Sequence, residues 1–163
     1  MTITFEPVRD EHVRSLTQIF NDYIEHSVSL FILEPIHNDE MRTMLFFEDI
    51  RHKAFVILVD HNLAGFISIH SYNPRTAYHD TAEISLYLAP EYTGRGIGTS
   101  ALKFIEAYAQ GQGFHVLLGS IAGENAASIR LFEKLGYIKV GHFRELGYKH
   151  GRWLDVVYYE KIL

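Results

Sequence analysis

The spacing of hydrophobic residues in the first 71 positions predicts a strand, two helices and a β-hairpin. Residues 2–8 alternate as a strand does, and apolar residues from Val13 to Ile24 then recur at helical spacing after Asp10, a predicted helix cap. Apolar runs at 54–59 and 63–71 predict two strands joined by a short polar turn. The second helix is expected between the first helix and this hairpin.

This second helix is predicted to begin at Asn38 or Asp39, after a loop that contains Glu34 and Pro35. Apolar residues recur at helical spacing along it and beyond it. The side chains expected to point toward the core are Met41, Met44, Leu45 and Ile50.

The second half of the chain contains further alternating elements. They are a strand at 80–88, a helix at about 97–112, a short buried strand at 115–120, a helix from Asn125 to Leu135 that ends at Gly136, and closing strands at about 137–146 and 153–161. This order predicts a single α/β (α+β) domain over residues 1–163, with a mixed sheet that has helices on both faces.

Composition and charge exclude several classes of function. With no cysteine, the chain has neither disulfides nor thiolate catalysis. Its longest apolar run, 54–59, is far below the roughly 18 residues of a membrane span, so we expect a cytoplasmic protein with no membrane partner. A net charge of -5 argues against nucleic-acid binding. The ten histidines lack metal-ligand spacing, so no metal is expected.

A turn with three glycines joins the predicted strand at 80–88 to the helix that follows. Gly94, Gly96 and Gly98 stand at alternate positions, which lets backbone amides crowd inward at the positive end of a helix. Such a turn binds a diphosphate. No lysine follows the glycines as in a P-loop, and the spacing is not that of dinucleotide-binding proteins, so the ligand is expected to be another diphosphate.

Two segments together resemble the acetyl-CoA site of the GNAT acyltransferases. The first is the turn at 92–98, and the second combines Asn-Ala-Ala-Ser at 125–128 with Leu-Phe-Glu-Lys-Leu-Gly-Tyr at 131–137. The resemblance implies the GNAT fold, a mixed seven-stranded sheet whose central strands splay apart to admit the pantetheine arm. It also implies acetyl-CoA as the cosubstrate.

The resemblance assigns residues to the acetyl-CoA site. Strand residues bond the pantetheine, the glycine turn holds the diphosphate, the segment that begins the next helix reaches the pantetheine, and a lysine meets the nucleotide phosphate. The strand residues are Leu86, Tyr87 and Leu88, and the residues of the glycine turn are Gly94, Arg95, Gly96, Ile97, Gly98 and Thr99. The residues at the start of the next helix are Asn125 and Ser128, and the lysine is Lys134. Taken singly, each has a plainer reading as a turn residue, a helix cap or a solvated charge. Thr93 replaces the Gln or Arg usual in the family.

Glu83 is the predicted catalytic carboxylate, because it precedes Leu88, the presumed carbonyl-binding position, on the same strand. If partial burial raises its pKa toward neutrality, it can take a proton from an ammonium group directly or through water. A carboxylate on a solvated sheet face, or in an ion pair with Arg75, is the alternative interpretation.

Phe132 stands where many GNAT enzymes have a tyrosine that acts as general acid to the thiolate. The proton must then come from water or from another hydroxyl, for which Tyr87 and Tyr137 are candidates. Otherwise the thiolate leaves unaided.

Residues 75–85 and 147–155 look like the branch of phosphinothricin and methionine sulfoximine or sulfone N-acetyltransferases. A guanidinium binds an α-carboxylate through two hydrogen bonds, so an arginine fits a free amino acid. Lys149 contacts the substrate, within one chain or across a homodimer interface, or it is a solvated hairpin residue. The residues expected at the substrate are Phe31, Arg75, Tyr78, Thr81, Glu83 and Lys149.

The predicted function is acetyl transfer from acetyl-CoA to the primary amine of a small amino acid or an amino-acid-like toxin, by direct attack in a ternary complex. One alternative moves the acceptor to a protein N-terminus or a ribosomal protein, which a wide, acidic groove would favour. Another is a noncatalytic acyl-CoA-binding module, which Phe132 slightly favours. A homodimer is expected.

Overall fold

The computed structural model describes all 163 residues, and its helices and strands follow the predicted order. They are β1 (Ile3–Pro7), α1 (Asp10–His26), α2 (Asn38–Leu45), β2 (Lys53–Val59), β3 (Asn62–Ser71), β4 (Thr81–Leu88), α3 (Ile97–Gly111), β5 (Val116–Ala122), α4 (Ala126–Lys134), β6 (Ile138–Lys149) and β7 (Arg152–Ile162). Single 3₁₀ turns at Thr76–Tyr78 and Pro90–Tyr92 flank β4.

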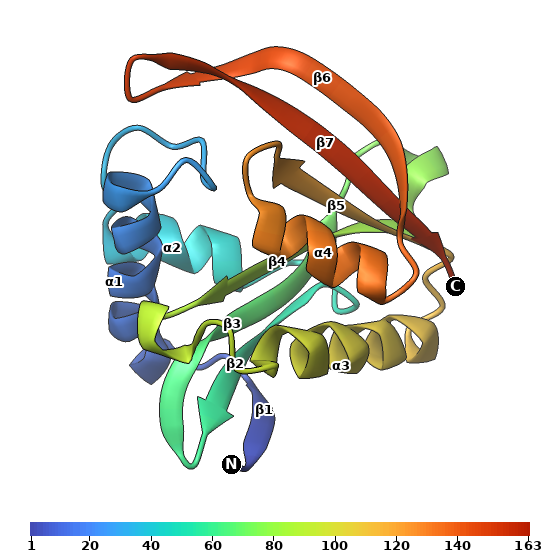
Figure 1. Cartoon of the computed structure of the whole chain (residues 1–163). Helices are drawn as coiled ribbons and strands as arrows, with labels where there is room; N and C mark the ends of the chain where they lie inside the picture. Colours follow the sequence, from blue (N-terminus) through green and yellow to red (C-terminus); the bar gives the residue numbers. More distant parts are fainter.

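The seven strands form one mixed sheet in the order β1-β2-β3-β4-β5-β7-β6, which confirms the predicted fold class. Every neighbouring pair is antiparallel except β4 and β5. These two strands pair only over Thr81–Glu83 and Val116–Leu118. Beyond that point they diverge, so the sheet opens at its centre (Figure 1).

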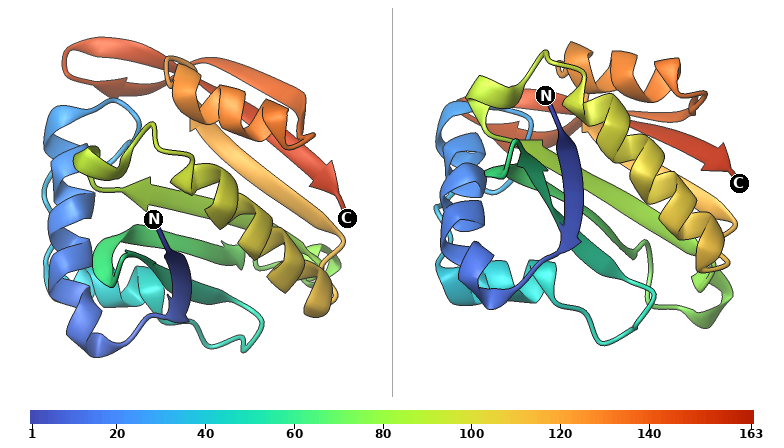
Figure 2. Two further views of the ribbon diagram at one scale, coloured as in Figure 1. Left: turned by 60° about the horizontal axis from the view of Figure 1, so that its bottom comes forward. Right: turned by 90° about the horizontal axis from the view of Figure 1, so that it is seen from below.

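Helices α1 and α2 cover one face of the sheet, and α3 and α4 cover the other (Figure 2). The α1/α2 side has a core that includes Leu16, Phe20, Met41, Val56 and Phe66. The α3/α4 side has a larger core that includes Ile67, Ile69, Ile97, Leu102, Ile105 and Phe132. Each fully buried side chain of this size contributes about 1.5–3 kcal/mol, so the two cores hold the divided sheet in shape.

Three local predictions need correction. Ile50 is 85% exposed instead of packing in the core, because α2 ends at Leu45 and the chain then turns. Helix α1 begins at Asp10 with Arg9 as its N-cap, one residue earlier than a cap at Asp10 implies. The closing hairpin is longer than predicted, because His150 and Gly151 both take positive φ and form a tight two-residue turn.

Candidate active site

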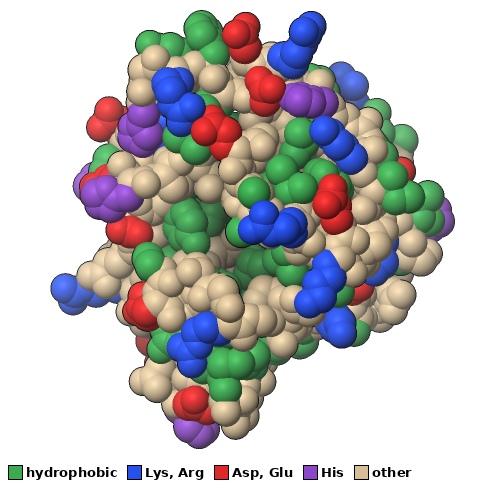
Figure 3. Space-filling view, in the orientation of Figure 1, with side chains coloured by type: hydrophobic (Ala, Val, Ile, Leu, Met, Phe, Trp, Pro, Cys, Tyr) green, Lys and Arg blue, Asp and Glu red, His purple; other side chains and the backbone are tan.

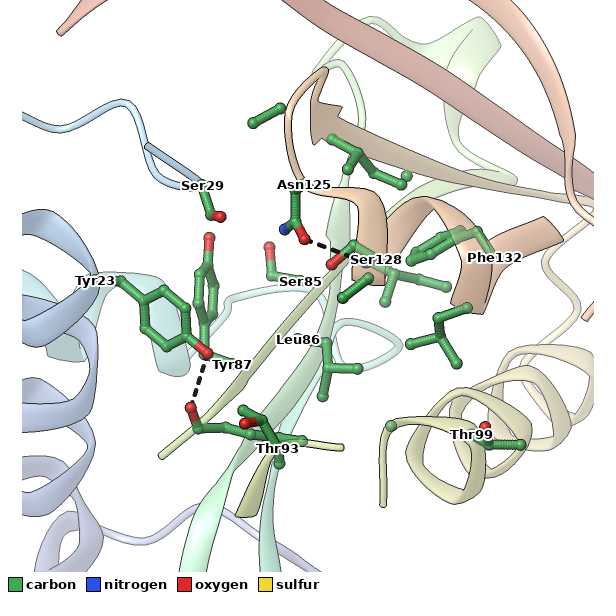
Figure 4. Close-up of a pocket in the computed structure, with 18 of the residues that line it drawn as sticks. Tyr23, Ser29, Ser85, Leu86, Tyr87, Thr93, Thr99, Asn125, Ser128 and Phe132 are labelled. Atoms are coloured by element: carbon green, nitrogen blue, oxygen red, sulfur yellow. Dashed lines mark hydrogen bonds between the residues drawn. The ribbon is translucent and has the colours of Figure 1, made fainter. Parts of the chain in front are cut away.

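A pocket of about 510 Å³ occupies the gap between the diverging halves of β4 and β5. Figure 3 shows a hollow on this side of the molecule, with hydrophobic side chains inside it. Residues from α1, β4, the glycine turn, β5 and α4 line the pocket. Figure 4 shows Tyr23 and Tyr87 on one side of it and Ser128 and Phe132 on the other.

The three glycines at the start of α3 serve two different needs. Gly94 and Gly96 have φ of 72° and 79°, a left-handed conformation that other residues adopt only with strain. Gly98 instead allows a close approach, because a Cβ there would lie 3.0 Å from Leu131 Cδ2 on α4. The first N–H groups of α3 have no partner within the helix and open toward the pocket, which suits a diphosphate.

Arg95 and Ile97 lie outside the pocket. The Arg95 guanidinium lies 5.5 Å from the centre of the Tyr92 ring and close to Met1. The Ile97 side chain is buried in the core. Of the residues predicted in this turn, Gly94, Gly96, Gly98 and Thr99 line the pocket, and Thr93 joins them.

Along β4, Leu86, Tyr87 and Leu88 all line the pocket. Pairing with β5 stops at Glu83, so the later backbone groups on that edge of β4 face the gap instead of a strand. Gly65 on β3 sits close beneath this part of β4, where a Cβ would lie 2.1 Å from the Tyr87 carbonyl oxygen. These backbone groups are therefore placed to bond a ligand that enters edge-on.

Helix α4 supplies the opposite wall. Asn125 caps the helix by accepting a hydrogen bond from the Ser128 backbone N–H at 3.2 Å, and both residues line the pocket. Phe132 also lines it, while its ring packs edge-on against Tyr137. Lys134 is exposed at the C-terminal end of α4 and does not line the pocket.

Glu83 lies between this pocket and a second, smaller hollow. It shares a face of β4 with Thr81 and Ser85, since alternate strand residues point the same way. Its carboxylate makes no ion pair, with Arg75 or any other residue, and burial alone raises its pKa. An unpaired, half-buried carboxylate with a raised pKa is a stronger base than an exposed one and is suited to accept a proton.

The second hollow, of about 160 Å³, contains three of the predicted substrate residues: Arg75, Tyr78 and Thr81. Its lining is almost entirely polar. The Arg75 side chain makes no hydrogen bond or ion pair. Its backbone is engaged at both groups: the N–H donates to Asn73 Oδ1, and the carbonyl oxygen accepts from the Tyr78 N–H. This guanidinium is therefore available to an anionic group.

Phe31 and Lys149 lie apart from both pockets. Lys149 is 2% exposed and donates from Nζ to the Leu30 carbonyl oxygen at 2.6 Å. The ring of Phe31 packs on Gly147, where a Cβ would lie 3.5 Å away. Together they fasten the loop after α1 to the β6–β7 hairpin, so Lys149 is not a solvated hairpin residue.

Several pocket residues were not predicted. Tyr23 donates from its hydroxyl to the Leu88 carbonyl oxygen at 2.8 Å, and Ser29 lies nearby (Figure 4). Tyr23 belongs to the apolar stripe of α1, and that spacing alone predicts a core position. The sequence does contain a signal for Ser85, because side chains alternate along β4 and Ser85 must share the face of Glu83.

Two further findings concern the chain as a whole. None of its helices combines the length and the apolar character needed to cross a bilayer. No three His, Asp or Glu side chains lie close enough together to hold a metal ion.

Known proteins resemble this chain along its whole length. The sequence model of the acetyltransferase (GNAT) family matches residues 13–137. A phosphinothricin N-acetyltransferase of Streptomyces coelicolor is 30% identical, over 99% of this chain and 96% of that protein. An L-methionine sulfoximine/L-methionine sulfone acetyltransferase of Pseudomonas aeruginosa is 30% identical, over 93% and 91%. The structure of a Sinorhizobium meliloti phosphinothricin acetyltransferase in complex with AcCoA superposes with a TM-score of 0.93 at 30% identity, covering 100% of this chain and 89% of that one.

Proposed function

This chain belongs to the acetyltransferase (GNAT) family, and from that premise we propose that it acetylates the primary amine of a small amino acid or an amino-acid-like compound. It is an acetyl-CoA-dependent N-acetyltransferase, similar at about 30% identity to enzymes of the phosphinothricin and methionine sulfoximine type. The observation that carries the proposed acceptor is the polar hollow with its unengaged Arg75, beside Glu83.

The gap between β4 and β5 fits acetyl-CoA. Its mouth has the free amides of α3 for a diphosphate, and its wall has unpaired strand backbone for amide groups. When bound, acetyl-CoA supplies the acetyl thioester. We assign the diphosphate to the turn from Gly94 to Thr99 and the pantetheine to Leu86–Leu88, Asn125 and Ser128. Arg95 and Ile97 contribute through backbone N–H groups, and Lys134 through charge near the nucleotide.

Glu83 is assigned as the general base. It takes a proton from the acceptor ammonium, directly or through water, and the neutral amine then attacks in a ternary complex. Arg75 holds the α-carboxylate through two hydrogen bonds, while Tyr78 and Thr81 flank the acceptor. The small size of this hollow favours a free amino acid over a protein N-terminus.

We also propose that this protein is cytoplasmic and that it forms a homodimer. Strand β6 is an open edge of the sheet, and large apolar side chains on the β6–β7 hairpin are exposed. They are Ile138, Val140, Phe143, Leu146, Tyr148 and Trp153. An exposed apolar edge of this kind is normally covered by a partner, and we place a second copy there. Phe31 and Lys149 line neither pocket of the single chain, so their proposed role at the acceptor is one that this second copy completes.

A thiol-release assay tests the proposed acceptor. Free amino acids, methionine sulfone and methionine sulfoximine are compared with peptides that have a free N-terminus. Turnover of free amino acids or their analogues, with none for the peptides, supports the proposal. Preference for peptides moves the acceptor to a protein, and absence of turnover for every amine with retained acetyl-CoA binding points to a binding module.

A further inference from the structure

A column of polar side chains crosses β3 and β4 on the face that carries Glu83. Residues directly opposite each other on antiparallel strands share a face, with Cβ atoms about 4.5–5.5 Å apart. Ser68 pairs with Ser85, and His70 pairs with Glu83. These four side chains therefore lie together, next to the point where the sheet opens.

His70 is hydrogen-bonded to Ser85, with Nε2 3.0 Å from Oγ. Its Nδ1 lies 3.4 Å from the Ser71 carbonyl oxygen, which can only accept. The proton of the neutral ring therefore belongs on Nδ1, and Nε2 accepts from the Ser85 hydroxyl. Burial lowers the pKa of His70, which favours the neutral ring, and the Nε2 lone pair of that ring is a site for a proton.

Two titratable groups face His70 from neighbouring elements. Glu83 lies opposite His70 on β4. His52 lies in the segment before β2, and the charge of His52 adds to burial in lowering the pKa of His70. Ser85 lines the large pocket, and Ser71 lines the smaller hollow. His70 thus lies between the two hollows and reaches the large pocket only through Ser85.

The reaction requires more than one proton acceptor. An ammonium nitrogen loses two protons when it becomes an amide, and only Glu83 has been assigned to take one. The other proton must reach the sulfur that leaves. Phe132 has no hydroxyl to deliver it, and Tyr137 is buried behind Phe132 and does not line the pocket. Tyr87 does line the pocket, but burial raises the pKa of its hydroxyl, which disfavours the tyrosinate that delivering the proton would leave.

We propose that Ser85 and His70 form a proton relay that accepts the second proton from the acceptor nitrogen and returns it to the coenzyme A sulfur. This inference rests on the proposed function. Glu83 takes the first proton and releases it to water. As the C–N bond forms, the nitrogen gives its second proton to Ser85 Oγ while the Ser85 proton moves to His70 Nε2. As the C–S bond breaks, His70 gives its proton back through Ser85 to the thiolate, so the relay ends unchanged.

The first test needs no turnover. Imidazole ¹⁵N chemical shifts of the full chain at pH 7 report the tautomer and charge of each histidine, and the His70→Gln variant assigns the signals of His70. We expect a neutral ring protonated on Nδ1, with an Nε2 signal that shifts in Ser85→Ala and not in the matched variant Ser68→Ala. A ring protonated on Nε2, or charged at pH 7, overturns the relay.

The second test is the pH dependence of kcat at saturating substrates. His70→Gln keeps a polar group of similar length, so it is expected to keep acetyl-CoA affinity while kcat falls about 10²-fold, the usual size of a proton-transfer contribution. On the acid side, the limiting slope of log kcat against pH is expected to be lower by one than in the wild-type protein. Ser85→Ala and the double variant should match His70→Gln, because the two residues act in series.

An unchanged slope in His70→Gln, or losses that add in the double variant, overturns the relay while leaving Glu83 as base. Ser68→Ala is expected to retain the wild-type slope. If the wild-type protein turns over no amine, the proposed function fails, and the ¹⁵N measurement still decides whether Ser85 donates to His70.

Discussion

Phe132 lies directly over Gly119, so closely that a Cβ on Gly119 would be 2.4 Å from Phe132 Cε1. The contact joins α4 to β5 across the pocket wall. Any larger residue at position 119 must push the ring, and with it α4, out of place.

Gly119→Ala is therefore expected to lower the free energy of unfolding by about 1–3 kcal/mol, the typical cost of overpacking a core. Gly111→Ala is the matched control, because a Cβ there meets nothing within 4 Å in the last turn of α3. That variant should gain roughly 0.5–1 kcal/mol from better helix propensity. Urea denaturation of both variants checks the pair, and equal effects would contradict the assigned contact.

Gly96→Val tests the diphosphate site. Gly96 and Gly113 have nearly the same φ, 79° and 80°, and a Cβ meets nothing within 4 Å at either position. Both valine variants should therefore lose similar stability, about 1–2 kcal/mol from left-handed strain. Only Gly96→Val should also weaken acetyl-CoA binding, as measured by isothermal titration calorimetry. Intact binding in Gly96→Val would place the diphosphate elsewhere.

Glu83 should reduce stability at neutral pH. Its pKa is raised in the folded protein above the ordinary value of 4.5, so the folded state holds the proton more tightly than the unfolded chain. Stability is then highest, with respect to this group, below pH 4.5 and declines as pH rises through the raised pKa. Glu83→Gln should be more stable than the wild-type protein at pH 7.5, and the difference should shrink toward pH 4.5 in urea titrations. A constant difference would mean that the carboxylate is not desolvated.

The proposed homodimer makes Trp153 an interface residue, although 61% of it is exposed in the single chain. Trp153→Lys places a charge in the apolar patch of β6 and β7 and should shift the mass measured by light scattering from dimer to monomer. Ile50→Lys is the control, since Ile50 is also highly exposed but lies on the loop after α2. A wild-type protein that is monomeric at micromolar concentration would contradict the interface.

Local signals in the sequence predicted most of the fold. Three short segments have a spacing that defines their structure: the glycine turn, the Asn125 cap and the strand that contains Glu83. Residues of all three line the pocket. Side chains whose surroundings depend on distant segments were harder to place. Lys149 contacts Leu30, more than a hundred positions away, so no local pattern revealed its burial.

His70 shows the same limit within the site. In the sequence it stands in an apolar strand pattern and gives no sign of a role. Its meaning depends on the register between β3 and β4, which places it opposite Glu83. The prediction for Ile50 was wrong for the opposite reason: the apolar spacing continues past Leu45, but the helix ends there.

The most direct test of the account combines turnover and binding in Glu83→Gln. With an amino acid that the wild-type protein acetylates, thiol release should fall by about 10²–10⁴-fold in kcat, the range for loss of a general base. Acetyl-CoA affinity, measured by calorimetry on the same samples, should stay within about twofold, because Glu83 does not line the large pocket. Unchanged turnover of that substrate by Glu83→Gln would contradict the assignment of this carboxylate as the base.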